Sequence, residues 1–113
     1  MTVTIYHNPR CTKSRQTLAR LHDQGIEPQV IEYLKEPIDE KTLKQLLKKL
    51  GMKAEQLVRQ KDRTALGLPR PESEAETIAQ MVANPKIIER PIVVVGNQAR
   101  LGRPPENVDE ILP

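Results

Sequence analysis

The chain of 113 residues contains one cysteine, two tyrosines, no phenylalanine and no tryptophan. A single cysteine cannot form an internal disulfide, so the chain lacks the disulfide framework that stabilises many small secreted domains. No apolar run approaches the roughly 20 residues that span a bilayer, and the start, MTVTIYHNP, lacks the features of a signal peptide. We therefore expect a cytoplasmic protein with a reduced thiol and no membrane partner.

The charge is mildly basic, with a net charge of +3 and a pI of about 9.2. A nucleic-acid binder usually shows a basic stripe with aromatic residues for stacking, whereas the lysines of LKQLLKKLGMK fit the solvated face of a helix. Two histidines and one cysteine make a poor metal set, and the chain has no glycine-rich phosphate loop. We expect no nucleic-acid partner, no metal and no bound cofactor.

The first third of the chain is typical of a β-α-β unit. Its composition predicts a strand over residues 2–6. One face of a helix is then predicted by residues at alternating steps of three and four: Cys11, Ser14, Leu18, Leu21 and Gly25. A second strand is predicted over residues 29–33. Two strands joined through such a helix should be parallel, with a right-handed crossover.

The middle of the chain is predicted to be mainly helical. Asp39 can cap a helix that carries a stripe of leucines and ends at Gly51. A short helix over residues 54–59 and a loop over residues 60–71 should follow. Ser73 then begins a further helix as the first residue of a capping box.

The last part of the chain returns to strands. The apolar residues 91–95 predict a central strand, and a Gly-Asn turn leads into a hairpin strand over residues 98–101. Residues 104–112 open with prolines suited to a helix start and carry one apolar face, so they predict a final helix.

This order of elements predicts an α/β fold. A β-α-β unit and a β-β-α unit around a mixed four-stranded sheet form the layout of a thioredoxin-like (glutaredoxin-like) fold. We expect residues 1–113 to form a single domain of this kind, with an inserted helical region at approximately residues 37–86.

Cys11 lies where the first predicted strand passes into the first helix. A helix N-terminus carries partial positive charge and unpaired N–H groups, and Arg10, Lys13 and Arg15 add further charge nearby. Such surroundings lower the pKa of a cysteine from its usual value of about 8.5, and they also attract anions. We therefore interpret Cys11 as a nucleophile rather than as a structural thiol.

Ser14 stands where a dithiol oxidoreductase carries its second cysteine. A serine cannot resolve a mixed disulfide, so any redox cycle needs a second sulfur from another molecule. The Ser14 hydroxyl could donate a hydrogen bond to the thiolate or simply occupy the first helical turn. His7 could raise the local positive potential, shuttle a proton or be structural. A phosphatase loop, C-x5-R, is excluded, because it would need an arginine at position 17, where the chain has Thr17.

Arg90 and Arg103 each precede a proline at the end of a predicted strand. A rigid turn restricts the side chain, and guanidinium groups bind tetrahedral oxyanions through forked hydrogen bonds. Two solvated arginines at strand ends would show the same pattern, so the residues alone leave both interpretations open.

Four segments, in order along nearly the whole chain, resemble the glutaredoxin-linked arsenate reductase family. They are IYHNPRCTKSR near the start, LVRQK in the middle, ERPIVV before the hairpin and RLGRPPE after it. The similarity is greatest to the bacterial subgroup with a C-x-K-S-R start. It implies a thioredoxin-like fold with a helical insertion, and reduction of arsenate to arsenite with glutathione as co-substrate and glutaredoxin as partner.

The resemblance also implies roles for individual residues. Cys11 is the expected nucleophile, and His7 and Ser14 match residues that help to lower the pKa of the thiol. Pro91 matches the cis-proline that faces the active cysteine in thioredoxin-like folds.

The family binds its oxyanion with three arginines, and the matching positions in this chain are Arg59, Arg90 and Arg103. The region after Arg59 looks shorter than in the plasmid-type reductases. Arg63 is therefore an alternative candidate for the third arginine.

Two other functions fit the same residues. One is a glutathione-dependent thiol oxidoreductase that acts on another substrate through Cys11. The other is a non-enzymatic regulatory binding module on the same fold, like the relatives that contact RNA polymerase. Those relatives often carry a CxxC switch, and Ser14 argues against one here.

Overall fold

Strand β1 (Val3–His7) is at the centre of the fold, and its alternate residues Val3, Ile5 and His7 are buried. In the computed structural model, which describes residues 2–113, β1 pairs in parallel with β2 (Gln29–Glu32) and antiparallel with β3 (Ile92–Val95).

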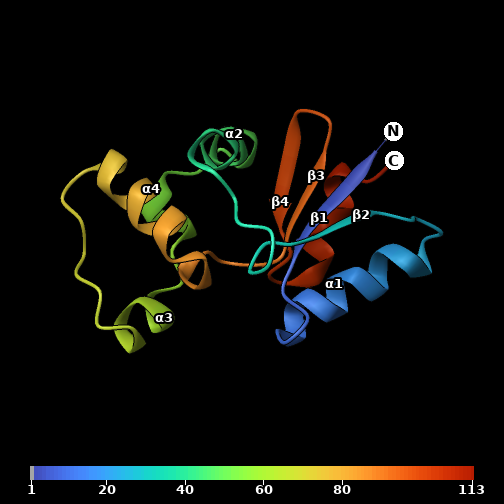
Figure 1. Cartoon of the computed structure of the whole chain (residues 1–113). Helices are drawn as coiled ribbons and strands as arrows, with labels where there is room; N and C mark the ends of the chain where they lie inside the picture. The colour runs from blue at the N-terminus through green and yellow to red at the C-terminus, as the bar shows by residue number, and fades with distance from the viewer. Residues whose placement is uncertain (1) are drawn as a thin grey trace. The chain divides into compact units, whose positions relative to one another are not determined.

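Strand β4 (Gln98–Leu101) forms a hairpin with β3 and completes a sheet of order β2-β1-β3-β4 (Figure 1). This is the predicted mixed four-stranded sheet, and the chain has a thioredoxin-like fold.

The described chain divides into two compact units. One unit contains the residues up to Glu36 together with Arg90–Pro113, and it holds all four strands. The other unit, Pro37–Glu89, contains only helices, both α and 3-10. The helical insertion expected at residues 37–86 falls inside this second unit.

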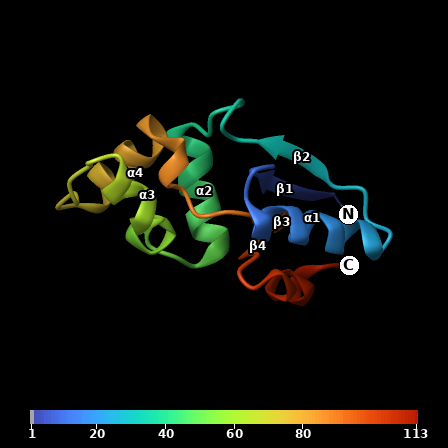
Figure 2. The same cartoon turned by 90° about the horizontal axis from the view of Figure 1, so that it is seen from below.

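The first unit has its core between the sheet and two helical segments. Helix α1 (Thr12–Asp23) and the 3-10 helix η3 (Pro105–Ile111), which replaces the predicted final helix, lie side by side in Figure 2. The guanidinium of Arg20 binds both carboxylate oxygens of Asp109 and so links the two helices. The core residues come from the sheet, α1 and η3: Val3, Ile5, Leu21, Val93, Val95, Val108 and Ile111.

The second unit is built on capped helices. Helix α2 (Glu40–Leu50) begins after Asp39, whose carboxylate accepts a backbone N–H of the first turn at 2.7 Å, and ends at Gly51 with a positive φ of 68°. Helix α4 (Glu74–Ala83) begins after Ser73, whose hydroxyl accepts a first-turn N–H at 3.2 Å. Both predicted caps are confirmed.

The predicted loop over residues 60–71 is wrong in its first half, because Gln60–Ala65 forms helix α3. This helix has almost no apolar pattern, which is why its sequence is typical of a loop. It is held by polar contacts instead: the Arg63 side chain is only 4% exposed and bonds to Glu55 and Gln80. Short 3-10 helices precede and follow this region, η1 (Ala54–Leu57) and η2 (Pro85–Ile87).

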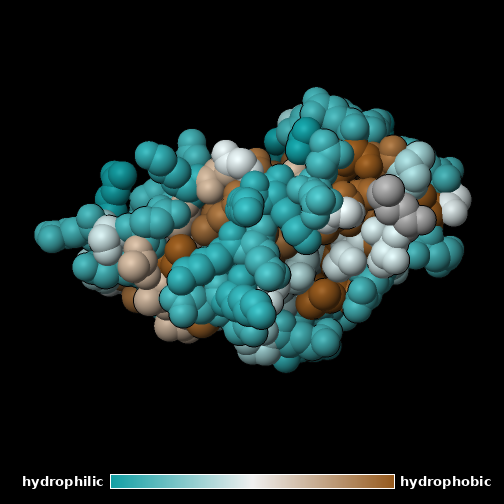
Figure 3. All heavy atoms as spheres, turned by 90° about the horizontal axis from the view of Figure 1, so that it is seen from above, coloured by the Kyte–Doolittle hydropathy of each residue, from teal (hydrophilic) through white to brown (hydrophobic). Residues whose placement is uncertain are grey.

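Hydrophilic residues cover much of the surface drawn in Figure 3, as expected for a chain with 29% charged residues. The large hydrophobic side chains that are exposed are Val30, Leu34 and Leu66. No helix within residues 2–113 is long and apolar enough to cross a membrane.

The ion pair between Arg63 and Glu55 gives a prediction about stability. Arg63→Ala should lower the free energy of unfolding by about 2 kcal/mol at pH 7, because the Glu55 carboxylate loses its buried partner. Urea unfolding measures this change. Arg70→Ala is the matched control: Arg70 lies 3.7 Å from the same carboxylate but is 77% exposed, so its loss should cost less than about 0.5 kcal/mol.

The same pair predicts a pH dependence. The hydrogen bond from Arg63 holds the pKa of Glu55 below its usual range. Its stabilisation is therefore present above the pKa of an unfolded glutamate, about 4.3, and is lost as the pH falls through the lower pKa of the folded protein. The difference in the free energy of unfolding between wild type and Arg63→Ala should therefore shrink in acid. Equal stability of wild type, Arg63→Ala and Arg70→Ala at pH 7 would contradict a stabilising role of the ion pair.

Candidate functional site

The only cysteine of the chain lies at the junction between β1 and α1. Cys11 is the N-cap residue of α1, with an extended backbone conformation and a partly exposed side chain. The turn before it is closed by Asn8: the Cys11 N–H donates to the Asn8 carbonyl and the Arg10 N–H donates to the Asn8 Oδ1, both at 3.0 Å. This turn fixes the sulfur at the first turn of the helix.

The surroundings of the sulfur favour a thiolate. Burial by itself would raise the pKa of Cys11, but hydrogen bonds from the backbone N–H groups of Ser14 and Lys13, together with the charge and a hydrogen bond of Arg90, lower the pKa below its usual value. The helix N-terminus thus acts as predicted. The cation that lowers the pKa is Arg90, which is distant in sequence, rather than a side-chain charge in the first turn.

Two arginines from the far end of the chain lie at Cys11. Arg103 Nη1 donates to Cys11 Sγ at 3.9 Å and to the Arg90 carbonyl oxygen at 3.4 Å. Arg90 is buried, with 4% of its surface exposed. The structure therefore brings together a thiol and two guanidinium groups that the sequence analysis singled out separately.

His7 and Ser14 form a buried pair behind the sulfur. The His7 Nδ1 and Ser14 Oγ atoms are 2.6 Å apart, and Ser14 Oγ also accepts the backbone N–H of Asn8 at 3.0 Å. Desolvation lowers the pKa of His7, so the imidazole is neutral at pH 7. This hydrogen bond between His7 and Ser14 holds the first turn of α1 against the end of β1.

Pro91 follows Arg90 at the start of β3, and the Arg90–Pro91 peptide bond is cis, as the resemblance implies. The Arg103–Pro104 bond is also cis. Both arginines that contact the sulfur thus immediately precede a cis-proline, and each lies at an end of a strand.

Arg59 and Arg63 both belong to the helical unit Pro37–Glu89 and differ in their surroundings. The Arg59 side chain is 27% exposed and lies 3.0 Å from an Asp62 carboxylate oxygen and 3.6 Å from a Glu89 carboxylate oxygen. The buried Arg63 uses all three guanidinium nitrogens in hydrogen bonds within its unit.

Sequence reasoning missed one contributor to the site. Asn8 closes the turn before Cys11, and the Asn-Pro dipeptide was a usable signal because asparagine side chains commonly bond to nearby backbone in turns. Arg63, the alternative candidate for the third arginine, is committed to its own unit, where its partners Gln60, Glu55 and Gln80 lie 3, 8 and 17 residues away.

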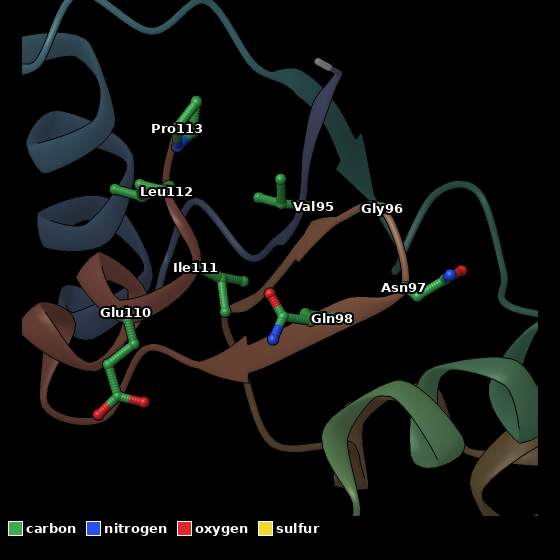
Figure 4. A pocket seen from close by; sticks show the side chains of 8 residues that line it. All are labelled: Val95, Gly96, Asn97, Gln98, Glu110, Ile111, Leu112 and Pro113. Carbon is green, nitrogen blue, oxygen red and sulfur yellow. The ribbon is translucent and has the colours of Figure 1, made fainter.

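A separate pocket of about 600 Å³ lies between the tip of the β3–β4 hairpin and the C-terminal segment (Figure 4). Val3 at the start of β1 pairs with Val95 at this tip, so the pocket is roughly 13 Å, the length of β1, from the end that leads to Cys11. It belongs to the opposite edge of the sheet. Within residues 2–113, no group of three or more metal-ligating side chains is assembled.

Comparison with known proteins places these features in a family. The model of the ArsC family matches residues 6–111. The uncharacterized protein YfgD of Escherichia coli (strain K12) is 53% identical over 114 residues, covering 97% of this chain and 96% of that protein. An arsenate reductase of Haemophilus influenzae is 44% identical, covering 99% and 100%. The solved arsenate reductase from Vibrio cholerae has a TM-score of 0.89 at 48% identity, covering 99% and 98%.

The electrostatics of the site predict how Arg90 affects thiol reactivity. Arg90→Met should raise the pKa of Cys11 and slow its alkylation by iodoacetamide several-fold at pH 7, because the thiolate loses a neighbouring positive charge. The alkylation rate measured against pH reports the change. Arg100→Met, on β4 and paired with the exposed Glu110, is the matched control and should leave the profile unchanged. An unaltered profile for Arg90→Met would refute the assignment.

Proposed function

Because this chain belongs to the ArsC family, we propose that it reduces arsenate to arsenite, with Cys11 as the nucleophile and an arginine-lined site for the oxyanion. The observation that carries the proposal is the contact of Arg103 with the Cys11 sulfur, beside the buried Arg90. Cations that stabilise a thiolate also bind the anion that the thiolate attacks. Relatives 40–45% identical to this chain are arsenate reductases.

The first step of the proposed reaction is attack of the Cys11 thiolate on As(V). A sulfur–arsenic bond forms, one arsenic–oxygen bond breaks, and the oxygen leaves as water after protonation. Backbone N–H groups at the start of α1 and the guanidinium groups of Arg90 and Arg103 balance the charge on the remaining oxygens. His7 and Ser14 keep the first turn in place while the sulfur changes its bonding.

The electrons come from outside thiols, because Ser14 occupies the position of a resolving cysteine. In the proposed cycle a glutathione thiol also bonds to arsenic with loss of water. A further thiol, from glutaredoxin, then attacks the glutathione sulfur, forming a mixed disulfide. The arsenic–sulfur electron pair stays on arsenic, which becomes As(III), and water releases arsenite from Cys11. No bound cofactor takes part, and such a cycle suits the reducing cytoplasm.

We propose that Arg59, the position implied by the resemblance, is the third oxyanion-binding arginine. Arg63 is buried and could bind an anion only by giving up its bonds to Glu55 and Gln80. Arg59 is more exposed, and the carboxylates of Asp62 and Glu89 orient its guanidinium.

A coupled assay tests the function. The purified protein is mixed with arsenate, glutathione, glutaredoxin and glutathione reductase, and NADPH consumption is followed. Wild type should consume NADPH in an arsenate-dependent manner, and Cys11→Ser should fall to the background rate, because a serine hydroxyl is not ionised at pH 7. Omission of glutathione or glutaredoxin tests each donor separately. A reactive, low-pKa Cys11 without arsenate turnover would overturn the arsenate proposal and favour a thiol oxidoreductase with another substrate.

The choice between the two arginines of the helical unit has its own test. Arg59→Ala should raise the KM for arsenate by about 10-fold or more, the effect of losing one charge-assisted contact to an anion, in addition to any loss of stability from losing the ion pair with the buried Asp62 carboxylate. Arg63→Ala should instead lower the unfolding midpoint and leave the KM of the folded fraction near that of wild type. The reverse pattern would assign the role to Arg63.

A further inference from the structure

Three segments that are distant in sequence meet at Gly102, a buried residue that follows β4. Its N–H donates to the carbonyl oxygen of Pro91 at 2.9 Å. The fully buried Thr17 of α1 donates its hydroxyl to the Lys13 carbonyl at 2.8 Å, and the same hydroxyl oxygen lies 3.4 Å from the Gly102 carbonyl oxygen. Gly102 is therefore enclosed between the start of β3 and the second turn of α1.

There is no space at Gly102 for a side chain. A Cβ atom at this position would lie 2.6 Å from Thr17 Oγ1, 2.8 Å from Pro91 Cγ and 3.1 Å from Thr17 Cγ2. Gly102 is not among the residues with positive φ, so the constraint is the lack of space rather than backbone conformation. This distinguishes it from Gly96 at the hairpin tip, which has a φ of 60° and nothing within 4 Å of a built Cβ.

The tight packing matters because the next residue is Arg103. Its Nη1 donates a long hydrogen bond of 3.9 Å to the Cys11 sulfur. To bring a Cβ at Gly102 from 2.6 Å to an ordinary contact of 3.4 Å, the neighbouring atoms must separate by about 0.8 Å. A shift of this size is enough to take Arg103 out of reach of the sulfur.

We propose that Gly102 is a positioning residue for the reaction: its missing side chain lets the end of β4 close against Thr17 and Pro91, and this closure holds Arg103 at Cys11. The inference rests on the proposed function for the role of Arg103 in anion binding. Its effect on the sulfur does not depend on the substrate, because the contact between Arg103 and Cys11 is present in the protein alone.

Gly102→Ala tests the proposal with two measurements, the rate of Cys11 alkylation by iodoacetamide at pH 6.5 and kcat/KM for arsenate. We expect slower alkylation, because the sulfur loses the hydrogen bond that Arg103 donates to it. We also expect a loss of at least about 10-fold in kcat/KM, because a displaced Arg103 no longer lies where it would bind the substrate anion. Thr17→Ala removes two of the three close contacts. The double variant Gly102→Ala/Thr17→Ala should therefore recover part of both losses.

A second double variant separates positioning from general destabilisation. In an Arg103→Ala background, Gly102→Ala should cause no further loss of alkylation rate, because the group that it displaces is already absent. Gly96→Ala, strained but at the opposite edge of the sheet, is the control: it should lower the unfolding midpoint without changing the alkylation profile.

Three results would overturn the proposal. The first is a wild-type alkylation profile for Gly102→Ala. The second is an alkylation rate of Gly102→Ala/Thr17→Ala no faster than that of Gly102→Ala alone. The third is a further loss of alkylation rate when Gly102→Ala is added to Arg103→Ala. If wild type shows no arsenate turnover, the proposed function fails, yet the alkylation measurements still decide the role of Gly102. If Gly102→Ala is poorly folded, the alkylation of its soluble fraction is compared with that of Gly96→Ala at equal loss of stability.

Discussion

Antiparallel pairing of β1 with β3 is the constraint on which the thiol site depends. Tyr6 lies opposite Ile92, so the chain that leaves β1 toward Cys11 passes beside the chain that enters β3 after Arg90. Ile92 in turn pairs with Leu101, which brings the end of β4 to the same edge of the sheet. Three strand ends thus meet where the sulfur lies, and a slip of one residue in either pairing would turn these side chains to the wrong face.

The site balances two opposed effects on a single sulfur. Partial burial disfavours the negative charge, while the helix N-terminus and Arg90 favour it, and the second effect is larger. Because the favourable groups are backbone N–H donors and a buried guanidinium, they are fixed before any anion arrives. The hydrogen bond between His7 and Ser14 joins the end of β1 to the first turn of α1, whose backbone N–H groups face the sulfur.

Much of the fold could be predicted from the sequence because its signals are local. The alternation in β1, the caps at Asp39 and Ser73 and the hairpin turn each depend on a few neighbouring residues. Helix α3 could not be predicted in this way, since Arg63 is stabilised by Glu55 and Gln80 rather than by an apolar stripe. Cys11 was identifiable from its place at a helix start. The contribution of Arg90 to the lowered pKa of Cys11 and the packing of Gly102 depend on tertiary contacts, which no local pattern reveals.

The single thiol sets a limit on the disulfide forms of this protein. A disulfide at Cys11 can join the chain to only one other molecule, and it occupies the same atom that would attack a substrate. Oxidation and loss of the nucleophile are therefore one event, without an internal thiol to reverse it. The position of a second cysteine is held by Ser14, which is enclosed between His7 and the backbone of Asn8. The rate at which oxidised Cys11 is reduced therefore depends on the concentration of thiols around the protein.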